Sequence, residues 1–238
     1  MSSPIAIIQA RMTSTRLPGK VLADIHGKPA LTRMLDRVGE AKRLGGIVVA
    51  TTTNASDDAI VGLAQRTGAT VFRGDELDVL GRFRAAAESV HAPVVMRLTA
   101  DCPMIDPGLL DDMVALFDRE ACDYASNCNT RTYPDGLDAE VFTIAALREA
   151  DERAKHTFLR EHVTPYIRGS RKELGAGAFR IEQLLAPADF SHVRWTLDRT
   201  DDLDRIRDLI GMLPEHYDWM AALAVATRHP RLLGLPAQ

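Results

Sequence analysis

Short apolar runs alternate with longer amphipathic segments through the first half of the chain. Four of these runs have the length and composition of strands, at residues 5–9, 47–52, 70–73 and 94–99. Apolar residues at helical spacing between and after them predict helices at residues 29–43, from Ser56 onward, at 77–91 and at 106–117. This alternation predicts an α/β fold of three layers around a mostly parallel sheet.

Local signals indicate where two of these helices begin. Ser56 is a candidate N-cap, since its hydroxyl can accept a hydrogen bond from a free backbone amide. Asp57 and Asp58 follow it in the first helical turn, where a negative charge is favourable. We expect Asp106 to cap the helix at 106–117 in the same way, with Pro107 at its first position.

The pattern changes after about residue 124. Residues 126–137 contain a Pro-Asp-Gly turn signal and predict a loop or hairpin. The rest of the chain predicts a helical stretch at 144–169, strands at 178–181 and 193–196, and helices at 201–212 and 218–227. We therefore expect one nucleotide-type sheet with a smaller second lobe, within a single domain.

Composition narrows the class of protein. The 238 residues are 46% hydrophobic, which is enough for one substantial core. A formal charge of −4 argues against a general nucleic-acid or anionic-membrane surface, so we expect no nucleic-acid partner. Cys102, Cys122 and Cys128 show no CxxC spacing, and no apolar run is long enough to cross a bilayer. These features lead us to expect a cytoplasmic protein with no membrane partner.

The loop after the first strand carries the first chemical signal. Arg11, Arg16 and Lys20 follow that strand closely, and Ser14 and Gly19 lie between them. A loop with these residues suits a backbone that wraps an anion, with cations held beside it, so it predicts a phosphate site. The alternative is a surface loop with scattered basic residues.

Carboxylates are expected at the same edge of the sheet. In open parallel sheets ligands bind at the carboxyl ends of the strands, and Asp101 and Asp198 each follow a predicted strand. Carboxylates that face a phosphate loop suggest a divalent cation between them, because Mg²⁺ takes one or two carboxylates together with phosphate oxygens. The alternatives are that Asp198 caps the next helix and that Asp101 caps the turn before Asp106.

Five segments, in the right order along most of the chain, resemble one family. They are IAIIQARMTSTRLPGKVLADIHGKPA, VLGRFRAAAE, RLTADCPMIDP, TYPDGLDAEVF and RWTLDRTDDL. They are similar to the CMP-sugar-acid synthetases, namely the 3-deoxy-manno-octulosonate and acylneuraminate cytidylyltransferases, and most of all to the SpsF-like branch. The final 25 or so residues match no segment of the family.

The resemblance implies a fold and an activity. The fold is Rossmann-like, of the GT-A nucleotidyltransferase type, and the activity moves CMP from CTP to a sugar or sugar acid, with Mg²⁺ as cofactor and pyrophosphate released, in surface polysaccharide biosynthesis. Within one domain, 1–238, residues 1–124 would form the nucleotide-binding half and 125–190 the lobe for the acceptor and for dimerisation. Residues 191–238 would bring a return strand with the metal Asp and the last helices. A homodimer is implied, with its contact around 145–168.

The resemblance also assigns roles to residues. Arg11 and Lys20 would be catalytic residues that hold the triphosphate, and Asp101 and Asp198 would bind the metal. The nucleotide-binding set is Gln9, Ala10, Arg11, Ser14, Arg16, Lys20, Arg73, Gly74, Asp75, Leu80 and Arg82. The acceptor-binding set is Tyr133, Asp135, His162, Tyr166, Glu182 and Gln183. His162 has an equal alternative as an ordinary helix-packing histidine.

Other functions stay open at this point. A GT-A glycosyltransferase would usually present a D-x-D triplet, whereas this strand ends Thr99-Ala100-Asp101 with one carboxylate. A nucleotidyltransferase for another base, such as a molybdopterin guanylyltransferase, would place glycines where Gln9 and Ala10 stand. A non-catalytic nucleotide-binding protein would lack one of the cations or carboxylates. Cys102 and the TYPDG loop differ from the octulosonate enzymes, so the sequence does not identify the sugar.

Overall fold

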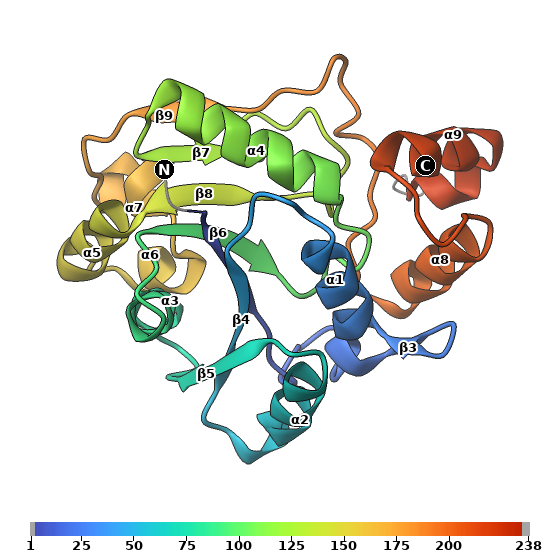
Figure 1. Ribbon diagram of the computed structural model, residues 1–238, viewed down its shortest axis with the longest axis horizontal. Helices are drawn as coiled ribbons and strands as arrows, with labels where there is room; N and C mark the ends of the chain where they lie inside the picture. Colours follow the sequence, from blue (N-terminus) through green and yellow to red (C-terminus); the bar gives the residue numbers. More distant parts are fainter. Residues whose placement is uncertain (1–2, 235–238) are drawn as a thin grey trace.

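A seven-stranded sheet organises the computed structural model, which describes residues 3–234 (Figure 1). The strand order is β5-β4-β1-β6-β8-β7-β9. Four parallel strands form one half of the sheet: β1 (Ile5–Gln9), β4 (Gly46–Thr52), β5 (Thr70–Gly74) and β6 (Val94–Thr99). Beyond β6 the sheet continues through an antiparallel pair and a last parallel partner: β8 (Glu140–Thr143), β7 (Tyr124–Ser126) and β9 (Ile181–Gln183). A small hairpin, β2 (Asp24–Ile25) with β3 (Lys28–Pro29), stands apart.

Helices cover both faces of this sheet, which makes the three layers predicted from the sequence. One hydrophobic cluster contains side chains of α1 (Ala30–Gly39), α2 (Asp58–Arg66), α4 (Pro107–Glu120), α8 (Thr200–Gly211) and α9 (Trp219–Arg228). The other contains side chains of α3 (Val79–Ser89), α5 (Ile144–Arg153), α6 (Thr157–His162) and α7 (Pro165–Arg168). Four short 3-10 turns complete the elements: η1 (Lys20–Leu22), η2 (Ala55–Asp57), η3 (Lys172–Leu174) and η4 (Pro230–Leu233).

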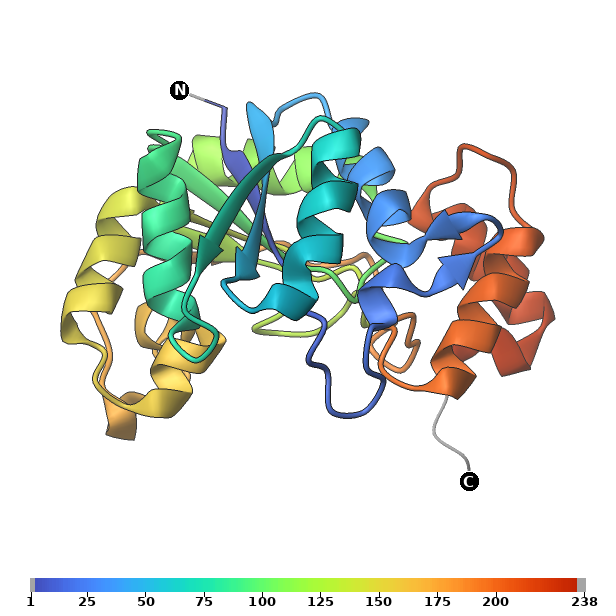
Figure 2. The ribbon, with the colours of Figure 1, turned by 90° about the horizontal axis from the view of Figure 1, so that it is seen from below.

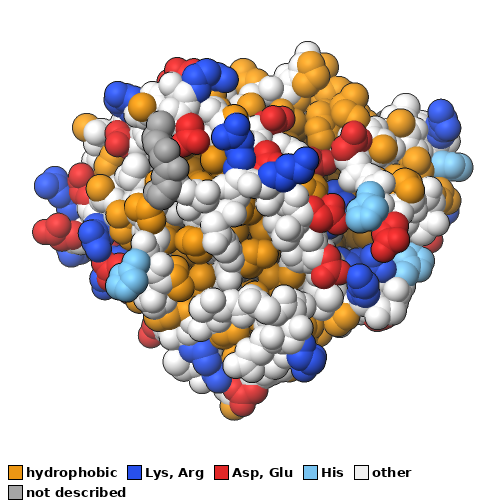
Figure 3. All heavy atoms as spheres, viewed as in Figure 1, with side chains coloured by type: hydrophobic (Ala, Val, Ile, Leu, Met, Phe, Trp, Pro, Cys, Tyr) orange, Lys and Arg blue, Asp and Glu red, His pale blue; other side chains and the backbone are white. Residues whose placement is uncertain are grey.

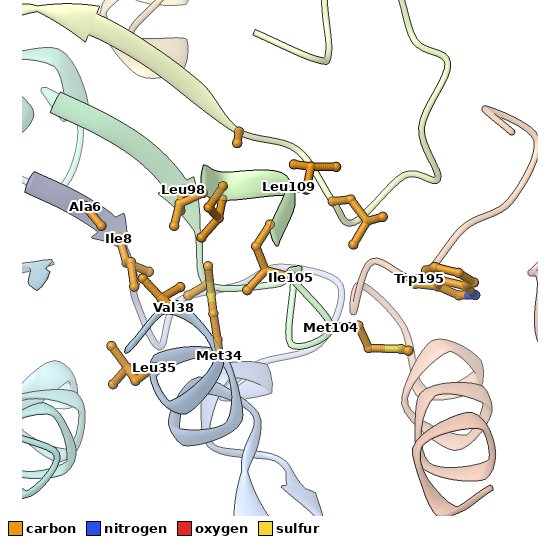
Figure 4. Close-up of a cluster of buried hydrophobic side chains, with 14 of the residues drawn as sticks. Ala6, Ile8, Met34, Leu35, Val38, Leu98, Met104, Ile105, Leu109 and Trp195 are labelled. Atoms are coloured by element: carbon orange, nitrogen blue, oxygen red, sulfur yellow. The ribbon is translucent and has the colours of Figure 1, made fainter. Parts of the chain in front are cut away.

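Strand β1 is an interior strand of the sheet, between β4 and β6, and packs on both faces. Ala6 and Ile8 point into the cluster with α1 and α4, next to Met34 and Leu98 (Figure 4). Ile7 points into the opposite cluster. Because successive strand side chains alternate between faces, a strand covered on both sides must be apolar throughout. The loop that follows β1 therefore starts from a strand that is buried on both faces.

Several predictions of single elements are confirmed. The strands at 5–9 and 94–99 have the expected bounds, and the Oδ1 atom of Asp106 accepts a hydrogen bond from the backbone N of Leu109 at 2.8 Å. The prediction for Ser56 is wrong, because α2 begins at Asp58 after a 3-10 turn and Ser56 forms no cap hydrogen bond. Asp57 turns inward instead and is 0% exposed.

The second half departs further from the prediction. The short strands β7 and β8 were not expected, and the strand expected at 178–181 lies at Ile181–Gln183. The helical stretch expected at 144–169 is divided into α5, α6 and α7. The break between α6 and α7 falls at Val163, which has a φ of 68°, a value that a β-branched residue rarely adopts.

The prediction of a strand at residues 193–196 is also wrong. Val193 and Trp195 are buried in alternation, but this segment makes only an isolated bridge between Asp135 and Arg194. The loop predicted at 126–137 comes close to this segment at Gly136, where an added Cβ atom would lie 2.8 Å from the carbonyl carbon of Trp195. The segment therefore lies against the loop and the C-terminal helices rather than in the sheet.

No helix within residues 3–234 is both long enough and apolar enough to cross a membrane. Figure 3 shows acidic and basic side chains interspersed over the face drawn there, without a large area of either charge.

Trp195 should be essential for the position of the 193–198 segment. Its side chain is 1% exposed, and its Nε1 donates to the backbone O of Leu232 at 3.2 Å. We expect Trp195→Ala to lower the free energy of unfolding by about 3–5 kcal/mol, since it leaves a large cavity. Urea denaturation measures this change. Met220→Ala, at an exposed site on α9, is the matched control and should change stability by less than about 0.5 kcal/mol.

Candidate active site

The loop after β1 begins between two neighbouring strands. The backbone N of Ala10 donates to Ala50 O at 3.3 Å, and that of Ala100 donates to Gln9 O at 3.1 Å, so hydrogen bonding extends past the end of β1 on both sides. The chain then turns back on itself, because the backbone O of Met12 accepts from Ser14 N at 2.9 Å and from Gly19 N at 3.0 Å. Figure 2 shows this loop between the α5–α7 lobe and the C-terminal helices.

Asp57 fastens the start of this loop from inside the protein. Its Oδ1 accepts from the backbone N of Met12 at 2.8 Å. Its Oδ2 accepts from the hydroxyls of Thr51 and Thr52, at 2.9 and 2.6 Å, and from the backbone N of Thr52 at 3.1 Å. Burial alone would raise the pKa of this carboxyl, but the hydrogen bonds from Thr52, Met12 and Thr51 outweigh burial and lower its pKa.

Lys20 lies between the two carboxylates predicted from the sequence. Its Nζ is 3.0 Å from Asp101 Oδ2 and 2.8 Å from Asp198 Oδ1. Burial lowers the pKa of the amine, but the charges and hydrogen bonds of both carboxylates more than compensate, so the pKa is raised. The ammonium therefore stays charged throughout the neutral pH range.

Asp198 has two further cationic partners. Arg16 Nη2 lies 2.9 Å from its Oδ1, and Arg194 Nη2 lies 2.6 Å from its Oδ2. Burial raises the pKa of Asp198, whereas Lys20 and Arg194 lower it, and the net pKa is lowered. Asp198 does not follow a strand of the sheet. It reaches the site because the backbone N of Leu197 donates to the backbone O of Asp101 at 2.8 Å.

Two neighbouring cavities open around the loop. The first, of about 220 Å³, is lined by Gln9, Ala10, Arg11, Ser14, Thr15, Arg16, Lys20, Val21, Thr99, Ala100, Asp101 and Asp198. The second, of about 300 Å³, is lined by Gln9, Ala10, Arg11, Arg16, Val79, Arg82, Arg97, Glu161 and His162. Four residues belong to both, so the two cavities share the wall formed by the end of β1 and its loop.

Arg11 lies beside Glu76, which comes from the loop between β5 and α3. Its Nη1 is 3.4 Å from Glu76 Oε1, and the same carboxylate accepts from Asn54 Nδ2 at 2.7 Å and from the Thr13 hydroxyl. The hydrogen bonds from Thr13 and Asn54 lower the pKa of Glu76. A third cavity, of about 530 Å³, adjoins this contact and includes Asp75.

Two arginines from outside the loop line the second cavity, the buried Arg82 and the partly buried Arg97. Arg82 is 4% exposed, and its Nη1 donates to the backbone O of Asp75 at 2.5 Å. Arg97 donates to Gln9 Oε1 at 3.0 Å and to the buried carboxylate of Glu140. The Nε atoms of both arginines are buried without a hydrogen-bond partner among residues 3–234.

The structure brings together most of the residues predicted around the phosphate. The first cavity contains Gln9, Ala10, Arg11, Ser14, Arg16, Lys20, Asp101 and Asp198, the second adds Arg82 and His162, and the third adds Asp75. A fourth cavity, of about 670 Å³, is lined by Arg16 together with Asp135. The remaining predicted residues line none of these four cavities: Arg73, Gly74, Leu80, Tyr133, Tyr166, Glu182 and Gln183.

Most of those remaining side chains have contacts within the protein. Arg73 donates to the backbone O atoms of Thr52 and Asn54 and pairs with Asp58, and Leu80 lies in the core. The rings of Tyr133 and Tyr166 pack edge to face on Trp219 and Phe179, respectively. Gln183 Oε1 accepts from the backbone N of Thr130 at 2.8 Å, and Glu182 is paired with Ala125 between β9 and β7.

Several residues of the site were not predicted. They are Asp57, Glu76, Arg97, Glu140, Glu161 and Arg194. Arg97 had a signal, since it is a charge within a mostly apolar strand run, which is uncommon without a buried partner. The signal at Asp57 was misleading: an acidic residue at the start of a helix is usually exposed, whereas this carboxylate is buried.

These features define a class of protein. A mostly parallel, doubly covered sheet carries three cations and two carboxylates at its carboxyl edge, which is the arrangement of a nucleotidyltransferase. The sequence model of the cytidylyltransferase family matches residues 5–218, and the chain belongs to this family. It is an enzyme of the nucleotidyltransferase type.

Curated proteins are similar to this chain over two thirds or more of its length. The spore coat polysaccharide biosynthesis protein SpsF of Bacillus subtilis is 34% identical over 239 residues, covering 97% of this chain and 96% of SpsF. The uncharacterized protein MJ1063 of Methanocaldococcus jannaschii is 43% identical over 163 residues, which are 68% of this chain and 66% of that protein.

Two solved structures show the same fold. A cytidylyltransferase from Leptospira borgpetersenii superposes with a TM-score of 0.92 and 30% identity, covering 100% of this chain and 99% of its own. The CMP:2-keto-3-deoxy-manno-octonic acid synthetase complexed with CTP has a TM-score of 0.64 at 19% identity, covering 88% of this chain and 99% of its own. At that identity the second structure supports the fold alone.

The buried carboxylate of Asp57 should make stability depend on pH. Its lowered pKa means that it stabilises the fold fully above the ordinary Asp pKa of about 3.9, and that this contribution is lost as pH falls through the lowered value. Asp57→Asn would turn an amide NH2 group toward groups that themselves donate hydrogen bonds. We therefore expect the free energy of unfolding to fall by about 1.5–3 kcal/mol at pH 7.

Urea denaturation of both proteins between pH 7 and pH 3.5 measures this effect. The difference in unfolding free energy between the wild type and Asp57→Asn should be constant above about pH 5 and become smaller below about pH 4. Asp58→Asn is the matched control, because Asp58 is the next residue and its side chain is 65% exposed. A difference that does not change with pH would contradict the assignment of the effect to the ionised carboxylate.

Proposed function

We propose that this enzyme transfers CMP from CTP to a hydroxyl of a sugar or sugar acid, with release of pyrophosphate, in the synthesis of a surface polysaccharide. The observation that carries this proposal is the single cavity that contains Arg11, Arg16 and Lys20 beside Asp101 and Asp198. SpsF supports the pathway, since it is a polysaccharide biosynthesis protein, and the synthetase solved with CTP shows that a protein of this fold binds that nucleotide.

The three cations suit a triphosphate. Guanidinium and ammonium groups bind phosphate oxygens through charge-assisted hydrogen bonds, and all three cations of the loop line the same cavity. Their partners in the protein are the carboxylates of Glu76, Asp101 and Asp198. A bound triphosphate would supply negative charge in place of these carboxylates, so the cations would exchange one set of partners for another.

The two carboxylates suit a divalent cation. Among residues 3–234 no group of three His, Cys, Asp or Glu side chains is arranged to hold a metal, so an all-protein cage is not present there. Asp101 and Asp198 supply hard oxygen donors, and Mg²⁺ often takes one or two carboxylates with phosphate oxygens completing its shell. A metal held by these two residues would polarise the α-phosphate and neutralise charge on the triphosphate.

The reaction is an in-line displacement. The acceptor hydroxyl oxygen forms a bond to the α-phosphorus as the bond from that phosphorus to the bridging oxygen of the β-phosphate breaks, and the hydroxyl proton is released. Lys20, Arg11 and Arg16 would offset the negative charge that develops on the leaving pyrophosphate. The protein contributes mainly position and charge, which the loop anchored on Asp57 supplies without reorganisation.

The remaining features of the proposal come from the family resemblance. A homodimer through the region around 145–168 stays a prediction, which light scattering on the purified protein tests. A cytoplasmic location is proposed because CTP is a cytoplasmic metabolite and Cys102, Cys122 and Cys128 are not joined in disulfides.

The nucleotide and the acceptor can be tested together. Wild-type protein is incubated with a divalent cation, one of CTP, UTP, GTP or ATP, and a panel of sugars and sugar acids, and pyrophosphate is measured. We expect release with CTP and at least one acceptor. Release with GTP alone would favour a guanylyltransferase, and binding of a UDP-sugar with no CTP turnover would favour a glycosyltransferase.

Lys20 should be essential for turnover. We expect Lys20→Ala to lower kcat/KM by about 100-fold or more, since it removes the buried cation of the phosphate cavity. Circular dichroism should show an unchanged fold. Lys28→Ala is the matched control, because Lys28 is exposed on the hairpin and pairs with Asp36 away from the cavity. Full activity of Lys20→Ala would contradict the proposal.

The carboxylates should govern metal dependence. Chelation with EDTA should stop pyrophosphate release, and Mg²⁺ or Mn²⁺ should restore it. Asp101→Asn and Asp198→Asn should raise the metal concentration needed for half-maximal activity, because each removes one charged ligand. Asp36→Asn, on the surface of α1, serves as the control. Unchanged metal dependence in both site variants would show that these carboxylates do not bind the metal.

A further inference from the structure

Gln9 is the last residue of β1 and lies in the wall shared by the two neighbouring cavities. On one side are Lys20 and the carboxylates, and on the other are Arg82, Arg97 and His162. A substrate that occupies both cavities would lie against the shared wall to which this side chain belongs. The orientation of the Gln9 amide therefore decides which atom of the side chain the substrate meets.

Arg97 fixes that orientation. A guanidinium group has only donors, so the atom of the Gln9 amide that faces it must be the oxygen. Arg97 Nη2 donates to Gln9 Oε1 at 3.0 Å, in agreement with this requirement. The amide NH2 group is then turned away from Arg97. Among residues 3–234 this Nε2 atom forms no hydrogen bond, although it can donate two.

Arg97 is itself held by a buried network. Its carboxylate partner Glu140 is 2% exposed and also accepts hydrogen bonds from the hydroxyls of Tyr124 and Thr164, each at 2.6 Å. These donors come from β7 and from the residue before α7, so three parts of the fold fix one carboxylate. Because both oxygens of Glu140 have partners, the carboxylate and the guanidinium group of Arg97 that it holds have little freedom to move.

We propose that Gln9 is a substrate-binding residue that donates a hydrogen bond from its amide nitrogen to an acceptor atom of the substrate, and that Arg97 and Glu140 are positioning residues that set this donor. The inference rests on the proposed function and adds a specificity element to it. The acceptor atom belongs either to the nucleobase or to the acceptor sugar, and the two sources predict different kinetics.

Two variants of nearly the same size test the hydrogen-bond donor of Gln9 separately from the rest of its side chain. Gln9→Glu keeps an oxygen for Arg97 but replaces the NH2 group by a second oxygen. Gln9→Met removes donor and acceptor without adding charge. The same changes at Gln65, which is exposed on α2 and lines none of the cavities described, are the controls. Steady-state kinetics with CTP, with UTP and with the acceptor are measured for all five proteins.

We expect both Gln9 variants to fold and to lose about tenfold or more in kcat/KM, as the loss of a substrate hydrogen bond requires. A donor to the base would also reduce the preference for CTP over UTP. A donor to the acceptor sugar would raise the KM of the acceptor and leave that preference unchanged. Either pattern supports the proposal, provided that the Gln65 variants match the wild type.

Other outcomes overturn it. Wild-type kinetics in Gln9→Met would show that no donor is needed, and wild-type kinetics in Gln9→Glu would show that Gln9 serves only as the partner of Arg97. The positioning role of Glu140 is tested by combining variants. Glu140→Gln should lower kcat/KM when Gln9 is present, but should cause little further loss of kcat/KM in Gln9→Met. Equal losses of kcat/KM with and without Gln9 would overturn that role. A wild-type protein without CTP-dependent pyrophosphate release would instead overturn the proposed function.

Discussion

The contact of Lys20 with Asp101 and Asp198 joins three segments that are distant in the chain. Lys20 and Asp198 are 178 residues apart, yet their charged atoms lie 2.8 Å from each other. Without a cation between them, two carboxylates at one edge of the sheet would repel each other. The 193–198 segment is not a strand of the sheet, so Asp198 is held by this contact, by its pairs with Arg16 and Arg194, and by the bond from Leu197 N to Asp101 O. The C-terminal helices that cover Trp195 are thus part of what forms the site.

Two buried carboxylates support the residues that face the cavities. Asp57 accepts four hydrogen bonds and holds the start of the phosphate loop, while Glu140 accepts bonds from three side chains and holds Arg97. A buried charge without partners would be very unfavourable, so each is tolerated only because its oxygens are satisfied. The same bonds that satisfy these charges make the cavity walls rigid. Preorganised walls are what a reaction controlled by position and charge requires.

How far the sequence predicted the structure depends on whether a local signal has one meaning. The apolar run of β1 and the Asp106-Pro107 start of α4 have one meaning each, and both predictions were confirmed. The alternation of apolar and polar residues at 193–196 has two possible meanings, because an extended segment packed on helices buries every second residue just as a strand does. The cations after β1 are close in sequence and were grouped correctly into one cavity. The packing of Tyr166 on Phe179 depends on how α7 docks, which no local pattern encodes.

The pairing of every loop cation with a carboxylate has a thermodynamic consequence for the proposed reaction. A divalent cation that took Asp101 and Asp198 would compete with Lys20 for the same oxygens. Only the two carboxylates raise the pKa of Lys20 against the opposing effect of burial, so an ammonium displaced from them would need a new anionic partner to stay charged. A triphosphate in the first cavity supplies that partner, just as it completes the metal's coordination. Metal and nucleotide would therefore each favour the binding of the other, and by linkage this coupling is reciprocal.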